Sequence, residues 1–121
     1  MEKSANIIIE CIDKYDNLYI KSYNNEIIAI EETIKDFINN KDYNILNYEY
    51  FCDMREDSDP DGRIEYPYDI KNENDYLNFL INKSNYNINN IQHLIYDYGD
   101  NNIIDNLEFD VVITRKNVKL R

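Results

Sequence analysis

Glycine and histidine are scarce in this sequence, and each scarcity excludes a class of function. The two glycines, Gly62 and Gly99, are too few for the glycine-rich loop that binds phosphate in nucleotide-binding proteins. The single histidine, His93, belongs to no Cys/His cluster, and no serine stands in a nucleophile motif. The sequence therefore predicts a protein that is not an enzyme and that needs no cofactor.

Cysteines and long apolar runs are also few. Cys11 and Cys52 each lie in an apolar, strand-like run outside any CxxC motif, so we expect two buried free thiols. Apolar runs such as residues 7–9 and 111–113 are far shorter than the roughly 20 residues that cross a bilayer. The N-terminal residues lack the basic start and apolar core of a secretory signal. We expect a cytoplasmic protein, and the abundance of Asn, Ile, Tyr and Lys is typical of a low-GC bacterium or its phage.

Acidic charge is the dominant feature of the composition. The sequence has 24 acidic and 13 basic residues, a net charge of −11 at pH 7. Residues 49–75 hold ten acids against three bases, whereas residues 111–121 hold four bases and no acid. Such a surface repels phosphate, so we expect no direct contact with nucleic acid or a membrane. Basic proteins and cations are the expected partners, and the alternative is that the acidity serves only solubility.

The apolar pattern predicts two helices between pairs of strands. Residues 6–12 and 18–23 are rich in β-branched and aromatic side chains and predict a hairpin. Apolar residues then recur at steps of three and four over residues 25–39, with Asn24 as the expected N-cap, and a shorter helix follows at 73–83 with Asn72 as its N-cap. Two further strands are predicted at 91–98 and 107–114.

Between the helices, the sequence predicts an acidic hairpin. Apolar and polar residues alternate over 46–54 and again over 64–70, on either side of a loop at 55–63. In this arrangement tyrosines back one face of the hairpin and carboxylates cover the other. Pro67 cannot donate a ladder hydrogen bond, so we expect the second strand to lie at a sheet edge, where other chains dock, or to be broken at this residue.

These elements predict an α+β fold in the order β-β-α-β-β-α-β-β. Short connections favour a mostly antiparallel sheet with two helices packed on one face. The length of 121 residues fits one domain spanning 1–121. Whether the basic tail at 115–121 packs on that domain or is a flexible end is left open.

The hairpin loop contains a partial calcium-binding pattern. Asp57, Asp59, Asp61 and Gly62 match the first half of a calcium loop, in which alternate oxygens converge on the ion. The twelfth position holds Tyr68 where the full motif needs a bidentate glutamate. A calcium-binding or calcium-stabilised domain is therefore an alternative, with these three aspartates as a weak metal site. A small enzyme that uses carboxylates or His93 is a further alternative.

We expect an intracellular inhibitor that binds and occludes a basic, nucleic-acid-handling protein. In a low-GC bacterium this describes an immunity protein against a toxin nuclease. In its phage it describes an anti-defence protein, for instance an anti-CRISPR-type mimic of nucleic acid. The predicted contacts are acidic and tyrosine side chains of the hairpin: Glu49, Asp53, Asp57, Asp59, Asp61, Glu65, Tyr66, Tyr68 and Asp69. The oligomeric state does not follow from the sequence.

Overall fold

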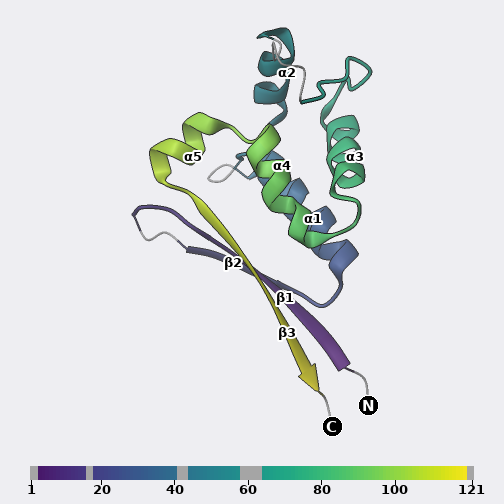
Figure 1. The fold of residues 1–121 in the computed structure, drawn as a ribbon, viewed down its shortest axis with the longest axis vertical. Coiled ribbons are helices and arrows are strands. Elements are labelled where there is room, and N and C mark those ends of the chain that lie inside the picture. Colours follow the sequence, from purple (N-terminus) through teal and green to yellow (C-terminus); the bar gives the residue numbers. More distant parts are fainter. Residues whose placement is uncertain (1–2, 16–17, 41–43, 58–63, 120–121) are drawn as a thin grey trace.

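The computed structural model describes residues 3–15, 18–40, 44–57 and 64–119. Within them the chain forms a three-stranded sheet of β1 (Lys3–Ile12), β2 (Leu18–Tyr23) and β3 (Asp110–Lys119) (Figure 1). β1 is central and pairs antiparallel with both neighbours, in the order β2-β1-β3. The predicted α+β class with an antiparallel sheet is confirmed, although two of the predicted strands are helices and a third does not form.

The first hairpin forms as predicted, and alternation along β1 separates the two faces of the sheet. Ile9 and Cys11 are buried, whereas Glu10 between them is only half-buried. In the register, Ile9 lies opposite Lys21 on β2 and Ile113 on β3. Because side chains alternate between the faces of a strand, one face of the sheet packs into the core and the other faces away from it.

The two predicted helices are present as α1 (Glu26–Asn39) and α3 (Glu73–Ser84). Asn25, and not the predicted Asn24, caps α1: its side chain accepts hydrogen bonds from the backbone N–H groups of Ile27 and Ile28, at 2.8 and 3.1 Å. Asn72 caps α3 as predicted, accepting from the N–H of Asp75 at 2.8 Å. Both helices thus begin where a side chain satisfies free backbone donors.

The predicted strand at 46–54 is wrong, because this segment forms the helix α2 (Tyr48–Asp57). The alternation places Phe51 on the solvent face of a strand, but Phe51 is 0% exposed in the structure. As a helix, the segment turns Tyr48, Phe51, Cys52 and Arg55 to one side, at the helical steps of three and four. Burying this aromatic ring outweighs the local strand pattern.

The predicted strand at 64–70 is also wrong, since this described segment forms no strand. Its carbonyl oxygens are bound by side chains instead of by a neighbouring strand. The Tyr98 hydroxyl donates to the oxygen of Glu65 at 3.0 Å, and Arg55 donates to the oxygens of Pro67 and Ile70. The predicted acidic hairpin is therefore replaced by a helix and an irregular segment held against it.

The C-terminal part contains two more helices, of which the first replaces the strand predicted at 91–98 and the second lies between the two predicted strands. Residues 91–98 form α4 (Ile91–Tyr98), preceded by the 3-10 turn η1 (Ile88–Asn90), and α5 (Asn101–Leu107) follows. On α4 the buried residues Ile91, Leu94, Ile95 and Tyr98 are spaced by three and four, a helical pattern that the β-branched composition obscures. β3 begins only at Asp110, after the left-handed Glu108 ends α5.

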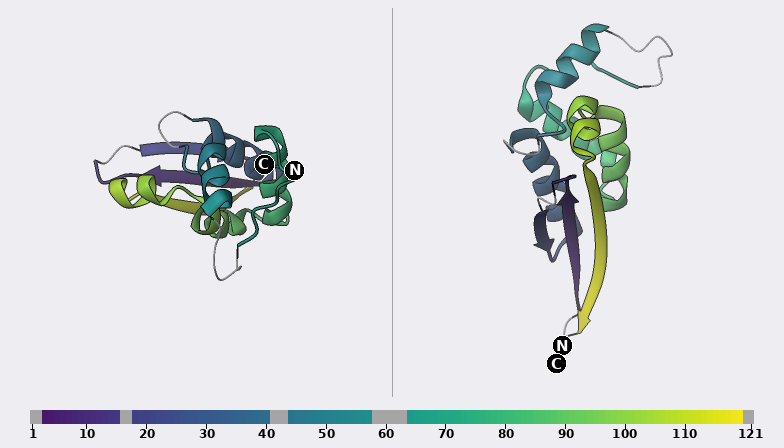
Figure 2. Two further views of the ribbon diagram at one scale, coloured as in Figure 1. Left: turned by 90° about the horizontal axis from the view of Figure 1, so that it is seen from above. Right: turned by 90° about the vertical axis from the view of Figure 1, so that its left-hand side faces the viewer.

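The helices gather toward one end of the sheet, and the paired strands β1 and β3 continue past them at the other end (Figures 1 and 2). A cluster of buried side chains joins β1, β3, α1, α2, α3 and α4. α1 contacts β2 and α3, and α3 contacts α4. None of the helices in the described ranges is long and apolar enough to span a membrane.

Candidate binding surface at helix α2

Helix α2 carries the acidic residues of the middle region on its exposed side. Glu49, Asp53 and Glu56 are exposed and follow one another at steps of four and three residues. Residues at these steps lie on the same side of a helix, about 5–6 Å apart between Cβ atoms. The three carboxylates therefore form a row along the helix, which we call the α2 acidic row.

Arg55 is the only basic residue of α2, and it points away from the α2 acidic row. Its Nη1 donates hydrogen bonds to the carbonyl oxygens of Pro67 and Ile70, at 2.8 and 3.0 Å. The guanidinium carbon lies 5.4 Å from the ring centre of Phe51 and 5.0 Å from that of Tyr68. Because these contacts hold Arg55 between α2 and the 64–70 segment, it does not neutralise the row.

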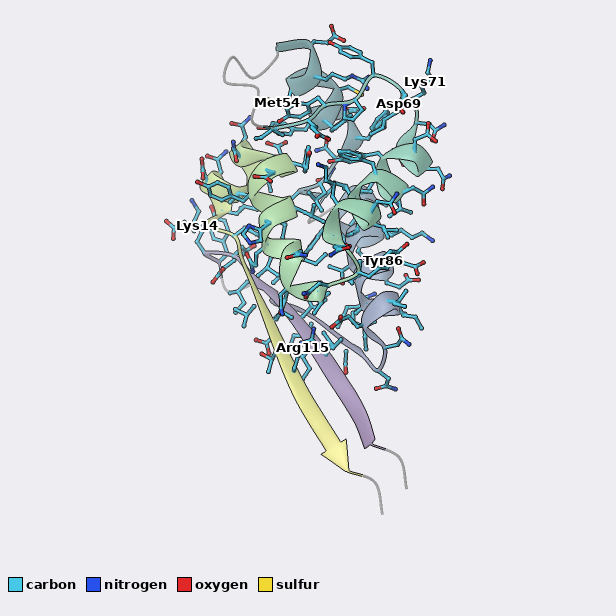
Figure 3. All side chains as sticks on the ribbon, turned by 45° about the vertical axis from the view of Figure 1, so that its right-hand side comes forward. Lys14, Met54, Asp69, Lys71, Tyr86 and Arg115 are labelled. Atoms are coloured by element: carbon cyan, nitrogen blue, oxygen red, sulfur yellow. The ribbon has the colours of Figure 1, made fainter. Side chains whose placement is uncertain are left out.

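The 64–70 segment adds an exposed tyrosine and a carboxylate next to the helix. Tyr68 is 66% exposed, and its hydroxyl donates to the carbonyl oxygen of Arg55 at 3.3 Å. Asp69 is exposed and lies with Lys71 at the α2 end of the molecule (Figure 3). Asp69 is thus exposed as the alternation predicts, whereas Tyr68, which the alternation places on the inner tyrosine face, is exposed instead.

Two predicted contact residues are less available for binding. Tyr66 packs inward, with its ring centre 5.4 Å from that of Phe51 and 5.7 Å from that of Tyr98. Glu65 is exposed, but its carboxylate pairs with Lys83 at 3.2 Å. Glu56, in contrast, was missed by the sequence analysis. A helical interpretation of residues 48–57 would have revealed it, because Glu56 lies one turn beyond Asp53.

An aromatic cluster supports this surface from below. The ring of Phe51 lies within 4.7–6.2 Å of the rings of Tyr48, Tyr66, Tyr76, Phe79 and Tyr98. Burial raises the pKa of Tyr76 and of Tyr98 well above the ordinary value, so both hydroxyls are neutral at physiological pH. Tilted and edge-on ring contacts of this kind fix the position of α2 on the body of the protein.

The three aspartates of the predicted calcium loop lie at the edge of the described residues or outside them. Asp57 is the last residue of α2, whereas Asp59 and Asp61 fall outside the described residues. The calcium loop accordingly stays a prediction. Elsewhere, in the parts of the chain that the structure describes, no group of three or more His, Cys, Asp or Glu side chains could hold a metal ion.

The comparisons with known proteins give no indication of the function. The chain matches no protein-family model, no curated protein and no solved structure. The chemistry of the α2 acidic row and its surroundings is therefore the basis for a functional proposal.

His93 lies on helix α4 and not in the predicted strand. It is exposed and borders a hollow of about 310 Å³ that Glu65, Lys83 and Asp97 also line. Among the described side chains, none makes a hydrogen bond or an ion pair that would orient the imidazole of His93. A general base needs such an orienting partner, so this hollow gives the enzyme alternative little support.

The two cysteines are free thiols, as predicted. Cys11 is fully buried on the core face of β1, while Cys52 of α2 is half-buried. Burial, with smaller contributions from the charges of Asp110 and Asp36, raises the pKa of the Cys11 thiol to about 12. Cys11 is thus protonated at neutral pH, which makes it a packing residue and not a nucleophile.

Proposed function

We propose that this protein is a stoichiometric inhibitor that binds a basic, nucleic-acid-handling protein through the α2 acidic row. The observation that carries the proposal is the position of Arg55. Because its guanidinium binds the carbonyl oxygens of Pro67 and Ile70, the only base of α2 leaves the three exposed carboxylates unneutralised.

The α2 acidic row presents closely spaced negative charges to a basic protein, as the phosphates of a nucleic-acid backbone do. The net charge of −11 adds a long-range field of the same sign. Such fields steer an oppositely charged partner and raise association rates by about 10- to 1000-fold. Tyr68, exposed beside the row, supplies an aromatic side chain of the kind that anchors protein interfaces.

Two biological settings fit this chemistry. In a low-GC bacterium the partner is a toxin nuclease, and the protein acts as its immunity protein. In a phage the partner is a nucleic-acid-binding defence protein, and the protein mimics the charge of the nucleic acid. Both settings place the protein in the cytoplasm, where its partner acts. A toxin gene next to the gene for this chain would favour the first, and a prophage setting the second.

The test compares immobilised wild-type protein with the variant Glu49→Lys/Asp53→Lys/Glu56→Lys in lysate of the native host. A control variant, Glu31→Lys/Glu32→Lys/Asp105→Lys, makes the same change of net charge at exposed positions of α1 and α5. The captured protein is then purified, its association rate is measured at low and at physiological salt, and its nuclease or nucleic-acid-binding activity is assayed.

We expect the row variant to lower the association rate at least about tenfold at low salt and to lose inhibition. The control variant should change the rate by less than about threefold, because its charges lie outside the contact. Equal effects of the two variants would mean that net charge, and not the α2 acidic row, drives binding. A separate variant that reverses Asp57, Asp59 and Asp61 tests the remaining predicted contacts.

A further inference from the structure

The face of the sheet that is turned away from the core carries an apolar patch, which Ser22, Thr114 and Asp110 border in the register. Along β1, Ile8, Glu10 and Ile12 alternate with the buried residues and share this face. In the register, Ile20 of β2 and Val112 of β3 lie on either side of Glu10. Ile20 is 53% exposed, Val112 40% and Ile12 36%. We call these five residues the open sheet face.

The composition of the open sheet face differs from that of an ordinary solvated sheet. An antiparallel sheet with one face in water normally carries polar side chains on that face. Here four of the five residues are Ile or Val, and they adjoin one another across three strands, whereas the polar residues Ser22, Thr114 and Asp110 lie at the border of the patch. Contiguous apolar surface on a folded protein marks a site of interaction.

Glu10 lies at the centre of this apolar surface, and no cation among the described side chains pairs with it. The neighbouring strand residues Lys21 and Arg115 belong to the opposite face, where they pair with Asp36 and Glu26 of α1. In the described part of the chain, no side chain forms an ion pair or hydrogen bond with the Glu10 carboxylate. Any molecule that covers this face must therefore pair with the carboxylate or bury it unpaired, at a high cost.

The outer edge of β3 is a poorer docking site than the face. Both backbone groups of Val111 are bound from within the chain: its N–H donates to the Asp110 carboxylate at 2.9 Å, and its carbonyl oxygen accepts from the Gln92 side chain. An added strand would have to displace these contacts. The side chains of Asp110 and Gln92 thus protect the start of this edge, as proteins commonly do.

We propose that the open sheet face binds an amphipathic α-helix of a partner protein, whose apolar stripe carries one Lys or Arg that pairs with Glu10. Three strands about 4.8 Å apart present a surface roughly as wide as the 10 Å diameter of a helix. Helices cover the opposite face of this sheet in the same manner. The positive residue follows from the central carboxylate, because only a cation both neutralises it and satisfies its oxygens.

A second copy of the chain is a less suitable occupant. Packing two open sheet faces together would bring two Glu10 carboxylates into one apolar interface, and like charges there cost several kcal/mol. The inference uses no residue of the α2 acidic row, so it stands or falls independently of the proposed function.

The probe for this site is a stapled helical peptide of about 12 residues, which matches the length of five strand residues. It carries leucines along one side and a single lysine in the middle of that side. Matched peptides carry glutamate or leucine in place of the lysine. Binding to the full-length ¹⁵N-labelled protein is followed by the shifts of its backbone amide signals.

We expect the lysine peptide to shift the amides of the open sheet face and to bind at least about tenfold more tightly than the glutamate peptide. In Glu10→Gln, an isosteric variant, this preference should fall to about onefold. Ile20→Lys should abolish binding, while Asp53→Lys on α2 should leave it unchanged. Circular dichroism of each variant verifies that it is folded.

The proposal is overturned if the lysine peptide does not bind, if it binds no better than the glutamate peptide, or if the shifts lie on the helical side. Light scattering of the free protein measures its oligomeric state and so tests whether a second copy of the chain covers the face. A dimer that Ile20→Lys converts to a monomer would mean that a second copy occupies the face, against the proposal.

Discussion

Nη1 of Arg55 lies 3.0 Å from the carbonyl oxygen of Ile70, and this hydrogen bond joins helix α2 to a segment that forms no strand. The same nitrogen also binds the oxygen of Pro67 at 2.8 Å. These two side-chain hydrogen bonds hold the segment against α2, where a hairpin would have used backbone hydrogen bonds between two strands. It also determines which charges α2 presents at the surface, because the guanidinium lies on the inner side of the helix.

Replacing Arg55 with Met should destabilise the protein by about 2 kcal/mol, since hydrogen bonds to a charged group contribute about 1.5–3 kcal/mol. The free energy of unfolding is measured by urea denaturation. Arg115→Met is the matched control, because Arg115 pairs with Glu26 at the surface, and exposed pairs contribute about 0–1 kcal/mol. Similar losses in the two variants would contradict a structural role for the inward contacts of Arg55.

Replacing Phe51 with Ala distinguishes the helix from the hairpin that the alternation predicts. In the helix Phe51 is fully buried among aromatic rings, so its truncation should cost about 3–5 kcal/mol. In a hairpin it would face solvent, and the loss would be small. Asp53→Ala, at an exposed position of the same helix, should change the stability by less than about 0.5 kcal/mol. Urea unfolding of both variants measures the difference.

Stability should fall at alkaline pH, in part through Cys11. Its pKa is raised from the ordinary 9.0 to about 12 in the folded state, so the unfolded chain releases this proton first. The resulting stabilisation is fully present below about pH 9 and is lost as the pH rises from about 9 to about 12. Urea midpoints between about pH 8 and pH 10.5 should therefore fall less steeply in Cys11→Ala than in the wild type.

Tyr23 and Tyr98, whose pKa values burial also raises, contribute to the alkaline loss in both proteins. The difference between the two slopes therefore isolates the thiol. Equal slopes would show that Cys11 ionises in the folded protein as readily as in the unfolded one.

Local sequence patterns were sufficient for the elements whose signals agree. The strands of the first hairpin combine β-branched composition with alternation, and α1 combines a helical period with a capping asparagine. Asn72 marks the start of α3 in the same way. The acidic surface was also predictable in its composition, since Glu49, Asp53 and Asp69 are all exposed.

Local patterns were misleading where two periods fit the same residues. Residues 46–54 alternate as a strand does, yet Tyr48, Phe51 and Cys52 also fit a helical face, and residues 91–98 have the same ambiguity. The aromatic rings of Tyr76 and Tyr98, distant in the sequence, decide the first case by surrounding Phe51. No window of sequence contains that contact.

By itself, the sequence determined the class of the fold, the acidity of the middle region and the free state of the thiols, because composition and short-range periodicity carry this information. Only the tertiary structure decided that Arg55 points inward and that no described cation pairs with Glu10. Both depend on which side of an element packs against distant residues. That choice depends on the burial of side chains from several elements together, which no single segment specifies.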